Sequence, residues 1–265
     1  MELQCKKNGS GAPVVLLHGM ATSSSYWNKV VDQLPDHEVL RMDLLGFGKS
    51  PKPKDSTYDY AAHVGAVAET IKSLNFPRPF TLVGHSMGAL IALRYATLYP
   101  SQIKNVLLVS TPVYMSPSEA KRGVTQDSKL KEKLYYGLAS RLVCEVVCKI
   151  PKPLAKRLVR FHINDDDTRI TEDIVDHTYR SYSKSLENII EHQTTAQDLW
   201  KVSAPVEFLY GKQDEQIALK NAKYIADKQA VPFVEVEGSH ALPLEDPEVV
   251  AGRIIALAQA KGSKI

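Results

Sequence analysis

A serine between two glycines is the first feature of this sequence that could do chemistry. The pentapeptide Gly84-His85-Ser86-Met87-Gly88 follows an apolar run at 79–83 and leads into a helical pattern at 89–96. A serine at a sharp turn from strand to helix has a strained backbone, and small residues two positions to either side let the two elements pass closely. The turn exposes the hydroxyl and directs the first helical N–H groups at the atom it attacks. The pattern favours a nucleophilic serine over a plain turn with a solvated one.

A serine hydroxyl needs a base, and the base needs a carboxylate that fixes its tautomer. Asp214 comes shortly after the apolar run Val206–Gly211, and His240 comes shortly after the run Phe233–Glu237. The order serine, aspartate, histidine along the chain, each at the end of a strand, separates one class of serine-triad folds from the others. Glu215 adjoins Asp214 and is the alternative carboxylate.

Two further strand ends lie upstream of the serine. The run 14–17 leads into His18-Gly19-Met20, a loop that could donate a second N–H group to an oxyanion. The run 38–42 leads into Asp43-Leu44-Leu45-Gly46-Phe47-Gly48-Lys49-Ser50. Five separated motifs therefore follow one another at the ends of predicted strands.

These five motifs, in this order and spacing over nearly the whole chain, resemble the α/β-hydrolase family. The resemblance implies that Ser86 is the nucleophile, that His240 is the general base and acid, and that Asp214 is the partner of His240. It also implies that the backbone N–H groups of Met20 and Met87 form the oxyanion hole. No cofactor and no metal is required by this chemistry.

The remaining residues of these motifs are expected to have structural roles. The 43–50 segment is similar to the D-x-x-G-x-G-x-S turn of the family, which is mostly structural there. Gly211 matches the strand-end turn of the family and favours Asp214 over Glu215. Two histidines are expected to be packed or hydrogen-bonded scaffold residues: His18 and His85.

Alternation of strand and helix patterns predicts an α/β fold. Near-continuous apolar strands indicate a mostly parallel sheet of about 7–8 strands, covered on both faces. Residues 1–11 have room for one antiparallel strand at most, so we expect a truncated sheet edge. The core domain is predicted over 1–111 and 205–265, and a helical cap inserted at 112–204.

The predicted cap has helical periodicity and few strand signals. An insertion at this point lies above the carboxyl edge of the sheet, where ligands bind, so we expect it to exclude water and contact substrate. The basic run 149–160 favours a solvated face over a lipid-binding one, and Cys144 and Cys148 favour core packing over a metal site. Helices are expected at 130–150 and 153–161, one or two more at 171–200, and a turn at 164–167.

Composition narrows the function classes. The 265 residues are 44% hydrophobic and carry a net charge of +3, which is enough for a core and too little to indicate nucleic acid. The apolar runs are too short to span a membrane, and residues 1–8 contain no apolar stretch of a signal peptide. Three cysteines fit a reducing compartment, and the cytoplasm is expected.

The expected activity is hydrolysis of carboxylic esters of small or medium apolar molecules. A serine at position 86 argues against the epoxide hydrolases and haloalkane dehalogenases of the resembled family, which have an aspartate at the corresponding position. Carbon–carbon bond hydrolases of vinylogous diketones remain an alternative, supported by the 180–188 pattern and opposed by Ala241, where those enzymes typically have tryptophan. Cofactor-free haloperoxidase activity and acyl transfer would use the same residues. The alternative without catalysis is a ligand receptor or binding module.

Overall fold

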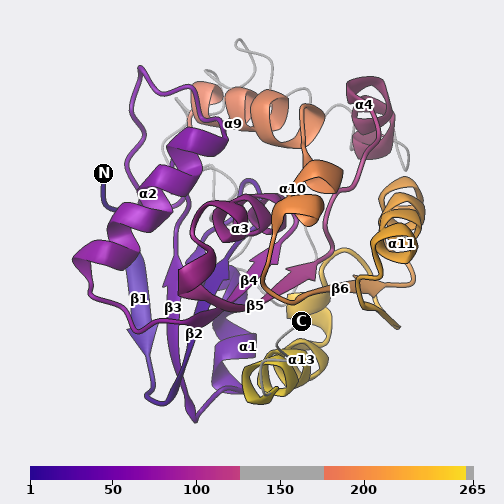
Figure 1. Ribbon diagram of the computed structural model, residues 1–265. Coiled ribbons are helices and arrows are strands. Elements are labelled where there is room, and N and C mark those ends of the chain that lie inside the picture. Colours follow the sequence, from indigo (N-terminus) through magenta and orange to yellow (C-terminus); the bar gives the residue numbers. More distant parts are fainter. Residues whose placement is uncertain (126–175, 261–265) are drawn as a thin grey trace, which may run out of the picture.

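The central element of the structure is one mixed sheet. The computed structural model describes residues 1–125 and 176–260. Within these residues, seven strands are hydrogen-bonded in the order β1-β3-β2-β4-β5-β6-β7, and all neighbours are parallel except β1 and β3 (Figure 1). This confirms the predicted α/β class and the mostly parallel sheet. The strands are β1 Cys5–Asn8, β2 Ala12–Leu17, β3 His37–Met42, β4 Phe80–His85, β5 Ile103–Val109, β6 Val206–Gly211 and β7 Phe233–Val236.

Helices connect the strands and lie on both faces of the sheet. The principal helices of the described residues are α1 Asn28–Asp32, α2 Tyr60–Ser73, α3 Met87–Leu98, α4 Pro117–Thr125, α9 Tyr179–Ser185, α10 Thr195–Lys201, α11 Gln216–Gln229, α12 Leu242–Glu245 and α13 Pro247–Gln259. Three short helical turns accompany them: the 3-10 turns η1 Ser24–Trp27 and η2 Pro100–Gln102, and the π-helical turn η3 Leu186–Glu191. Residues 1–11, expected to form one antiparallel strand at most, contain the single short strand β1, which pairs antiparallel with β3 at the sheet edge.

Two hydrophobic cores lie on opposite sides of the sheet. In β2, Val15 and Leu17 belong to the core that includes α2, α3 and α11, whereas Val14 and Leu16 belong to the core that includes α1 and α13. Successive side chains of a strand point to opposite faces, so a strand covered on both sides must be apolar throughout. This explains why these strands read as continuous apolar runs.

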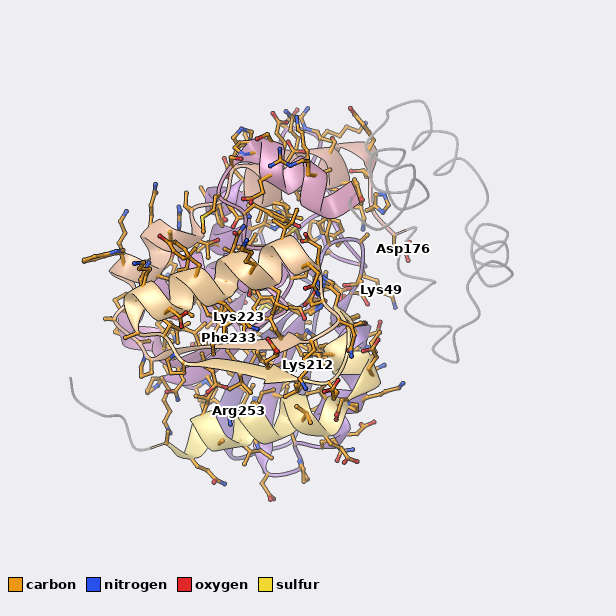
Figure 2. The ribbon with its side chains drawn as sticks, turned by 90° about the vertical axis from the view of Figure 1, so that its right-hand side faces the viewer. Lys49, Asp176, Lys212, Lys223, Phe233 and Arg253 are labelled. Atoms are coloured by element: carbon orange, nitrogen blue, oxygen red, sulfur yellow. The ribbon has the colours of Figure 1, made fainter. Side chains whose placement is uncertain are left out.

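Contacts between helices and the last strands hold the β6–β7 side of the sheet in place. Lys223 of α11 lies over the ring of Phe233 of β7, with its ammonium nitrogen 5.9 Å from the ring centre (Figure 2). On the other face, Arg253 of α13 forms an ion pair with the buried Glu207 of β6. Each of the two strands is thus contacted by a flanking helix, β7 by α11 and β6 by α13.

The described part of the predicted cap is helical. It comprises α4, α9, η3 and α10, and α9 and α10 lie on the α3 side of the sheet, away from α13 (Figure 1). The predicted helices at 130–150 and 153–161, the turn at 164–167, the basic run and the two cap cysteines lie outside the described residues. The boundaries of the cap stay a prediction. No helix in the described ranges is long and apolar enough to cross a membrane.

Candidate active site

Ser86 sits in the sharp turn that the sequence predicts. β4 ends at His85 and α3 begins at Met87, so Ser86 alone makes the turn, with φ 52° and ψ −123°. A positive φ is uncommon for a residue with a side chain and persists only when the surroundings enforce it. Two backbone bonds do so, from Ser86 N–H to Val109 O at 3.0 Å and from Ala89 N–H to Ser86 O at 2.9 Å.

The two glycines of the motif allow the close approach that this turn requires. A methyl group added at Gly84 would overlap the carbonyl oxygen of Gly88. One added at Gly88 would overlap the carbonyl oxygen of Leu17 and lie 2.5 Å from that of His18. Backbone atoms cannot move aside as a flexible side chain can, so the start of α3 lies against the end of β2 only because Gly88 has no side chain.

We expect Gly88→Ala to lower the free energy of unfolding by about 3 kcal/mol, because overpacking against backbone forces both segments apart. The measurement is a urea unfolding curve for each variant. The matched control is Gly65→Ala in α2, where an added methyl group meets nothing within 4 Å. That variant should gain about 0.5–1 kcal/mol from helix propensity. Equal stability changes in the two variants would contradict this explanation of Gly88.

Asp214 and His240 form a hydrogen-bonded pair. Their loops leave the neighbouring strands β6 and β7, and His240 Nδ1 lies 2.8 Å from Asp214 Oδ1. The Asp214 side chain is 1% exposed, whereas that of His240 is 43% exposed. The Glu215 carboxylate is held elsewhere, by the Tyr114 hydroxyl at 2.6 Å. Of the two adjacent carboxylates, the structure therefore brings Asp214 to the histidine.

The two loops are also hydrogen-bonded to each other. Gln213 N–H donates to Gly238 O at 3.0 Å, and Gly238 N–H donates to the side-chain oxygen of Gln213 at 2.8 Å. A methyl group at Gly211 would overlap the Gly238 carbonyl oxygen. Gly211 thus permits the close approach of the two loops that carry Asp214 and His240.

Electrostatics keep the Asp214 carboxylate ionised. Burial raises the pKa of this carboxyl, but the charge and hydrogen bond of His240 and the N–H of Glu215 lower it by more. The balance is a pKa below the ordinary value for aspartate. An ionised Asp214 accepts the proton-bearing Nδ1 of His240, which leaves Nε2 as the basic nitrogen of the ring.

His85 joins the serine turn to the histidine loop. It precedes Ser86, is 4% exposed, and donates from Nε2 to the backbone oxygen of His240 at 2.8 Å. Its ring stacks on Tyr26, with ring centres 4.7 Å apart. Burial lowers the pKa of His85 to about 3, so this ring is neutral at physiological pH. His85 has the scaffold geometry that the sequence indicates, and it holds the backbone of His240 beside the serine turn.

The loop after β2 reaches the same place. A methyl group added at Gly19 would lie 3.2 Å from the Cβ atom of Ser86. Met20 follows Gly19 directly, and Met87 opens α3, where the first N–H groups have no partner within the helix. The serine turn and this loop are therefore adjacent, as an oxyanion site built from the two backbones would require.

Comparisons with known proteins identify the family of this chain. A family profile described as alpha/beta hydrolase fold matches residues 12–247. The chain belongs to the α/β-hydrolase fold family. "Probable lysophospholipase BODYGUARD 4" from Arabidopsis thaliana is 31% identical over 84% of this chain and 57% of its own length. Lipase 3 from a Moraxella species is 27% identical over 86% of this chain and 70% of its own length.

A solved structure shows the same fold. The esterase EaEST from Exiguobacterium antarcticum superposes with a TM-score of 0.73 at 21% identity, covering 97% of this chain and 96% of the esterase. This α/β hydrolase spans little more than half the length of its BODYGUARD relative. The relatives accordingly show the fold and the hydrolase family, and the substrate has to be argued from the site.

The Asp43–Ser50 turn of this α/β hydrolase has structural contacts. The two carboxylate oxygens of Asp43 accept the N–H groups of Ser24 and Lys49, each at 2.8 Å. His18 is fully buried and accepts the Leu44 N–H on Nε2 at 2.8 Å. These bonds fix the loops after β2 and β3, and thereby the backbone that leads to Met20.

Sequence patterns did not reveal Gln193, which joins the two ends of the predicted insertion. Its amide nitrogen donates to the backbone oxygens of Pro112 and Ile190 at 2.6 and 3.0 Å. Its amide oxygen accepts from Tyr114 N–H at 3.2 Å and from the Thr195 hydroxyl at 2.7 Å. A glutamine in a polar segment carries no periodic signal, so only the folded chain shows this clasp.

An ion pair between a partly exposed arginine and a buried aspartate, also without a sequence signal, attaches α10 to the helix that follows Ser86. Arg94 of α3 donates from Nε to both carboxylate oxygens of Asp198, at 2.9 and 3.0 Å, and its guanidinium lies 4.5 Å from the ring centre of Tyr60. Asp198 is 2% exposed. Across the described residues, no group of three or more potential metal ligands is arranged around a common point.

Proposed function

We propose that this α/β hydrolase cleaves carboxylic esters through an acyl-enzyme, with Ser86 as nucleophile, His240 as general base and acid, and Asp214 as the partner of His240. The observation that carries the proposal is the 2.8 Å bond from His240 to a buried Asp214, with the His240 backbone bound by His85, the residue before a serine at positive φ. A nucleophile, a base and an orienting group are what acyl transfer by serine needs.

The proposed reaction has two halves. Nε2 of His240 takes the proton of the Ser86 hydroxyl as Oγ forms a bond to the ester carbonyl carbon. The tetrahedral intermediate then collapses, the bond to the alcohol oxygen breaks, and His240 returns the proton to the departing alcohol. Water attacks the acyl-enzyme in the same way, with His240 again as base, and releases the acid and Ser86. Asp214 keeps its charge throughout and stabilises the imidazolium.

We assign the oxyanion hole to the backbone N–H groups of Met20 and Met87. The proximity of the Gly19 backbone to Ser86 and the position of Met87 at the start of α3 support the assignment. Loss of one such donor typically costs about 3–4 kcal/mol of transition-state stabilisation. The Met20 side chain, which is partly buried against the core, would give the acyl group a soft, apolar wall. The Met87 side chain is fully buried in the core, so it acts through its backbone alone.

The substrate class of the proposal is a small or medium apolar ester. Three relatives carry names of ester-cleaving enzymes, a lysophospholipase, a lipase and an esterase, which supports ester chemistry in this chain. The segment 112–204 would act as a cap that excludes water and contacts the acyl chain. Its attachment to α3 through Arg94 and Asp198 supports that role.

The test is hydrolysis of p-nitrophenyl esters from acetate to decanoate. We expect kcat/KM to peak at one chain length, which measures the acyl pocket. A fluorophosphonate probe should inactivate the protein in parallel. Absence of turnover on every ester would overturn the ester proposal. Cleavage of vinylogous diketones, acyl transfer and ligand binding would then be the alternatives.

A further inference from the structure

Glu215, the residue after Asp214, carries a second carboxylate. Glu215 Oε2 accepts a hydrogen bond of 2.6 Å from the hydroxyl of Tyr114, a residue of the segment after β5 that is 8% exposed. Nothing in the chemistry of the triad requires this carboxylate or its tyrosine. The two residues are 101 positions apart, so their contact is a feature of the fold.

Helix α4 covers this pair. A methyl group added at Gly123 of α4 would overlap the ring of Tyr114 and lie 2.8 Å from Glu215 Oε1. Gly123 is therefore in direct contact with both side chains, and Oε1 of Glu215 is buried. Charges sheltered in this way interact over a longer range than charges on an open surface, because water screens them less.

Glu215 is also bonded to the candidate triad. Its backbone N–H donates to Asp214 Oδ1 at 2.7 Å, and the same oxygen accepts His240 Nδ1 at 2.8 Å. The ionisable groups that interact with Glu215 are Tyr114 from the segment after β5, Tyr210 from β6, Asp214 from its own loop and His240 from the loop after β7. His240 is the one among them that gains a positive charge during the proposed reaction.

Burial raises the pKa of Glu215, the hydrogen bond from Tyr114 lowers it, and the charge of Asp214 raises it again. The balance lies above the ordinary value for glutamate. The hydrogen bond from Tyr114 thus favours the charged form of Glu215, which burial and the charge of Asp214 disfavour. The 2.6 Å bond from Tyr114 is therefore the contact that favours a charged carboxylate at this point.

We propose that Glu215, held by Tyr114 beneath α4, is a positioning residue that raises the basicity of His240. The inference rests on the proposed function only for its kinetic readout. A second negative charge near the imidazolium stabilises the protonated form of His240, so the ring takes the serine proton more readily. Because Tyr114 lies under the first helix of the predicted cap, the placement of that helix would also influence the charge at the triad.

The first test replaces the charge and keeps the shape. Glu215→Gln retains an oxygen that accepts the Tyr114 hydroxyl, so a merely structural role predicts no change in the pH profile. We expect the acid limb of kcat/KM to move to lower pH by about half a pH unit, given a partly screened interaction. Tyr114→Phe should move the limb in the same direction by less, because the carboxylate then protonates more easily. Glu248→Gln, which removes an exposed carboxylate on α13, is the matched control and should move nothing.

The second test needs no turnover. The titration of the His240 imidazole is followed by NMR in two proteins, Ser86→Ala alone and Ser86→Ala combined with Glu215→Gln. A lower titration midpoint in the doubly substituted protein supports the inference even if no ester is hydrolysed, in which case only the proposed function fails. An unchanged midpoint overturns the inference, even if Ser86-dependent hydrolysis is observed.

Discussion

Ser86→Ala lowers kcat/KM for the preferred ester by about 10⁴- to 10⁶-fold, the range typical of losing a catalytic serine. The loss is this large because no neighbouring group can replace an oxygen that must stand clear of the sheet at φ 52°. Binding and the oxyanion donors remain, so a small residual rate above water is expected. The measurement is steady-state hydrolysis of the p-nitrophenyl ester that gives the highest kcat/KM.

The control for this prediction is Ser73→Ala. Ser73 lies in α2 and donates to the Thr70 backbone oxygen at 3.0 Å, so its replacement removes a hydroxyl far from the candidate site. It should change kcat/KM by less than about twofold, as is usual for substitutions away from a site. Hydrolysis that survives in Ser86→Ala at the rate of the Ser73 variant would exclude Ser86 as the nucleophile.

Asp214→Asn should lower kcat/KM by about 10⁴-fold, although the shape of the side chain is retained. When the amide nitrogen of the asparagine faces the ring, it offers no acceptor for the Nδ1–H of His240, so that tautomer is no longer selected. The asparagine also carries no charge that could stabilise the imidazolium. The pH profile of kcat/KM measures the effect. Asp227→Asn, an exposed change of the same kind on α11, should leave the profile unaltered.

The same variant has a signature in stability. The pKa of Asp214 is lowered in the folded protein, so the carboxylate stabilises the native state above the ordinary carboxyl range. This contribution is lost as the pH falls through the lowered pKa. Between about pH 5 and pH 2, the free energy of unfolding of the parent should therefore fall more steeply than that of Asp214→Asn. Parallel curves would mean that the pair with His240 does not stabilise the fold.

Local patterns were enough to predict the framework of the site. The apolar runs around Val14–Leu17 and Val206–Gly211 predict strands because buried parallel strands must be apolar on both faces. The spacing of Gly84, Ser86 and Gly88 predicts the turn because only glycine fits where backbones nearly touch. The residues of the candidate site lie in short segments, each at the end of a strand, and such segments carry recognisable patterns.

Long-range side-chain contacts were beyond the reach of sequence reasoning. Gln193 binds residues near both ends of the predicted insertion, and Tyr114 binds Glu215, which is 101 positions away in the sequence. Neither contact has a periodicity or a motif, because each depends on where two separate elements pack. The sequence indicated Glu215 only as an alternative to Asp214 for binding the histidine. In the structure, Asp214 binds His240 and Glu215 binds Tyr114.

The proposed nucleophile is tested most directly by locating the residue to which a fluorophosphonate binds covalently. The protein is treated with a fluorophosphonate, digested, and mapped by mass spectrometry, with Ser86→Ala and His240→Ala treated alongside. We predict one phosphonate on the peptide that contains Ser86, no label in Ser86→Ala, and strongly slowed labelling in His240→Ala. Stoichiometric labelling at another residue, or equal labelling of all three proteins, would contradict Ser86 as the nucleophile activated by His240.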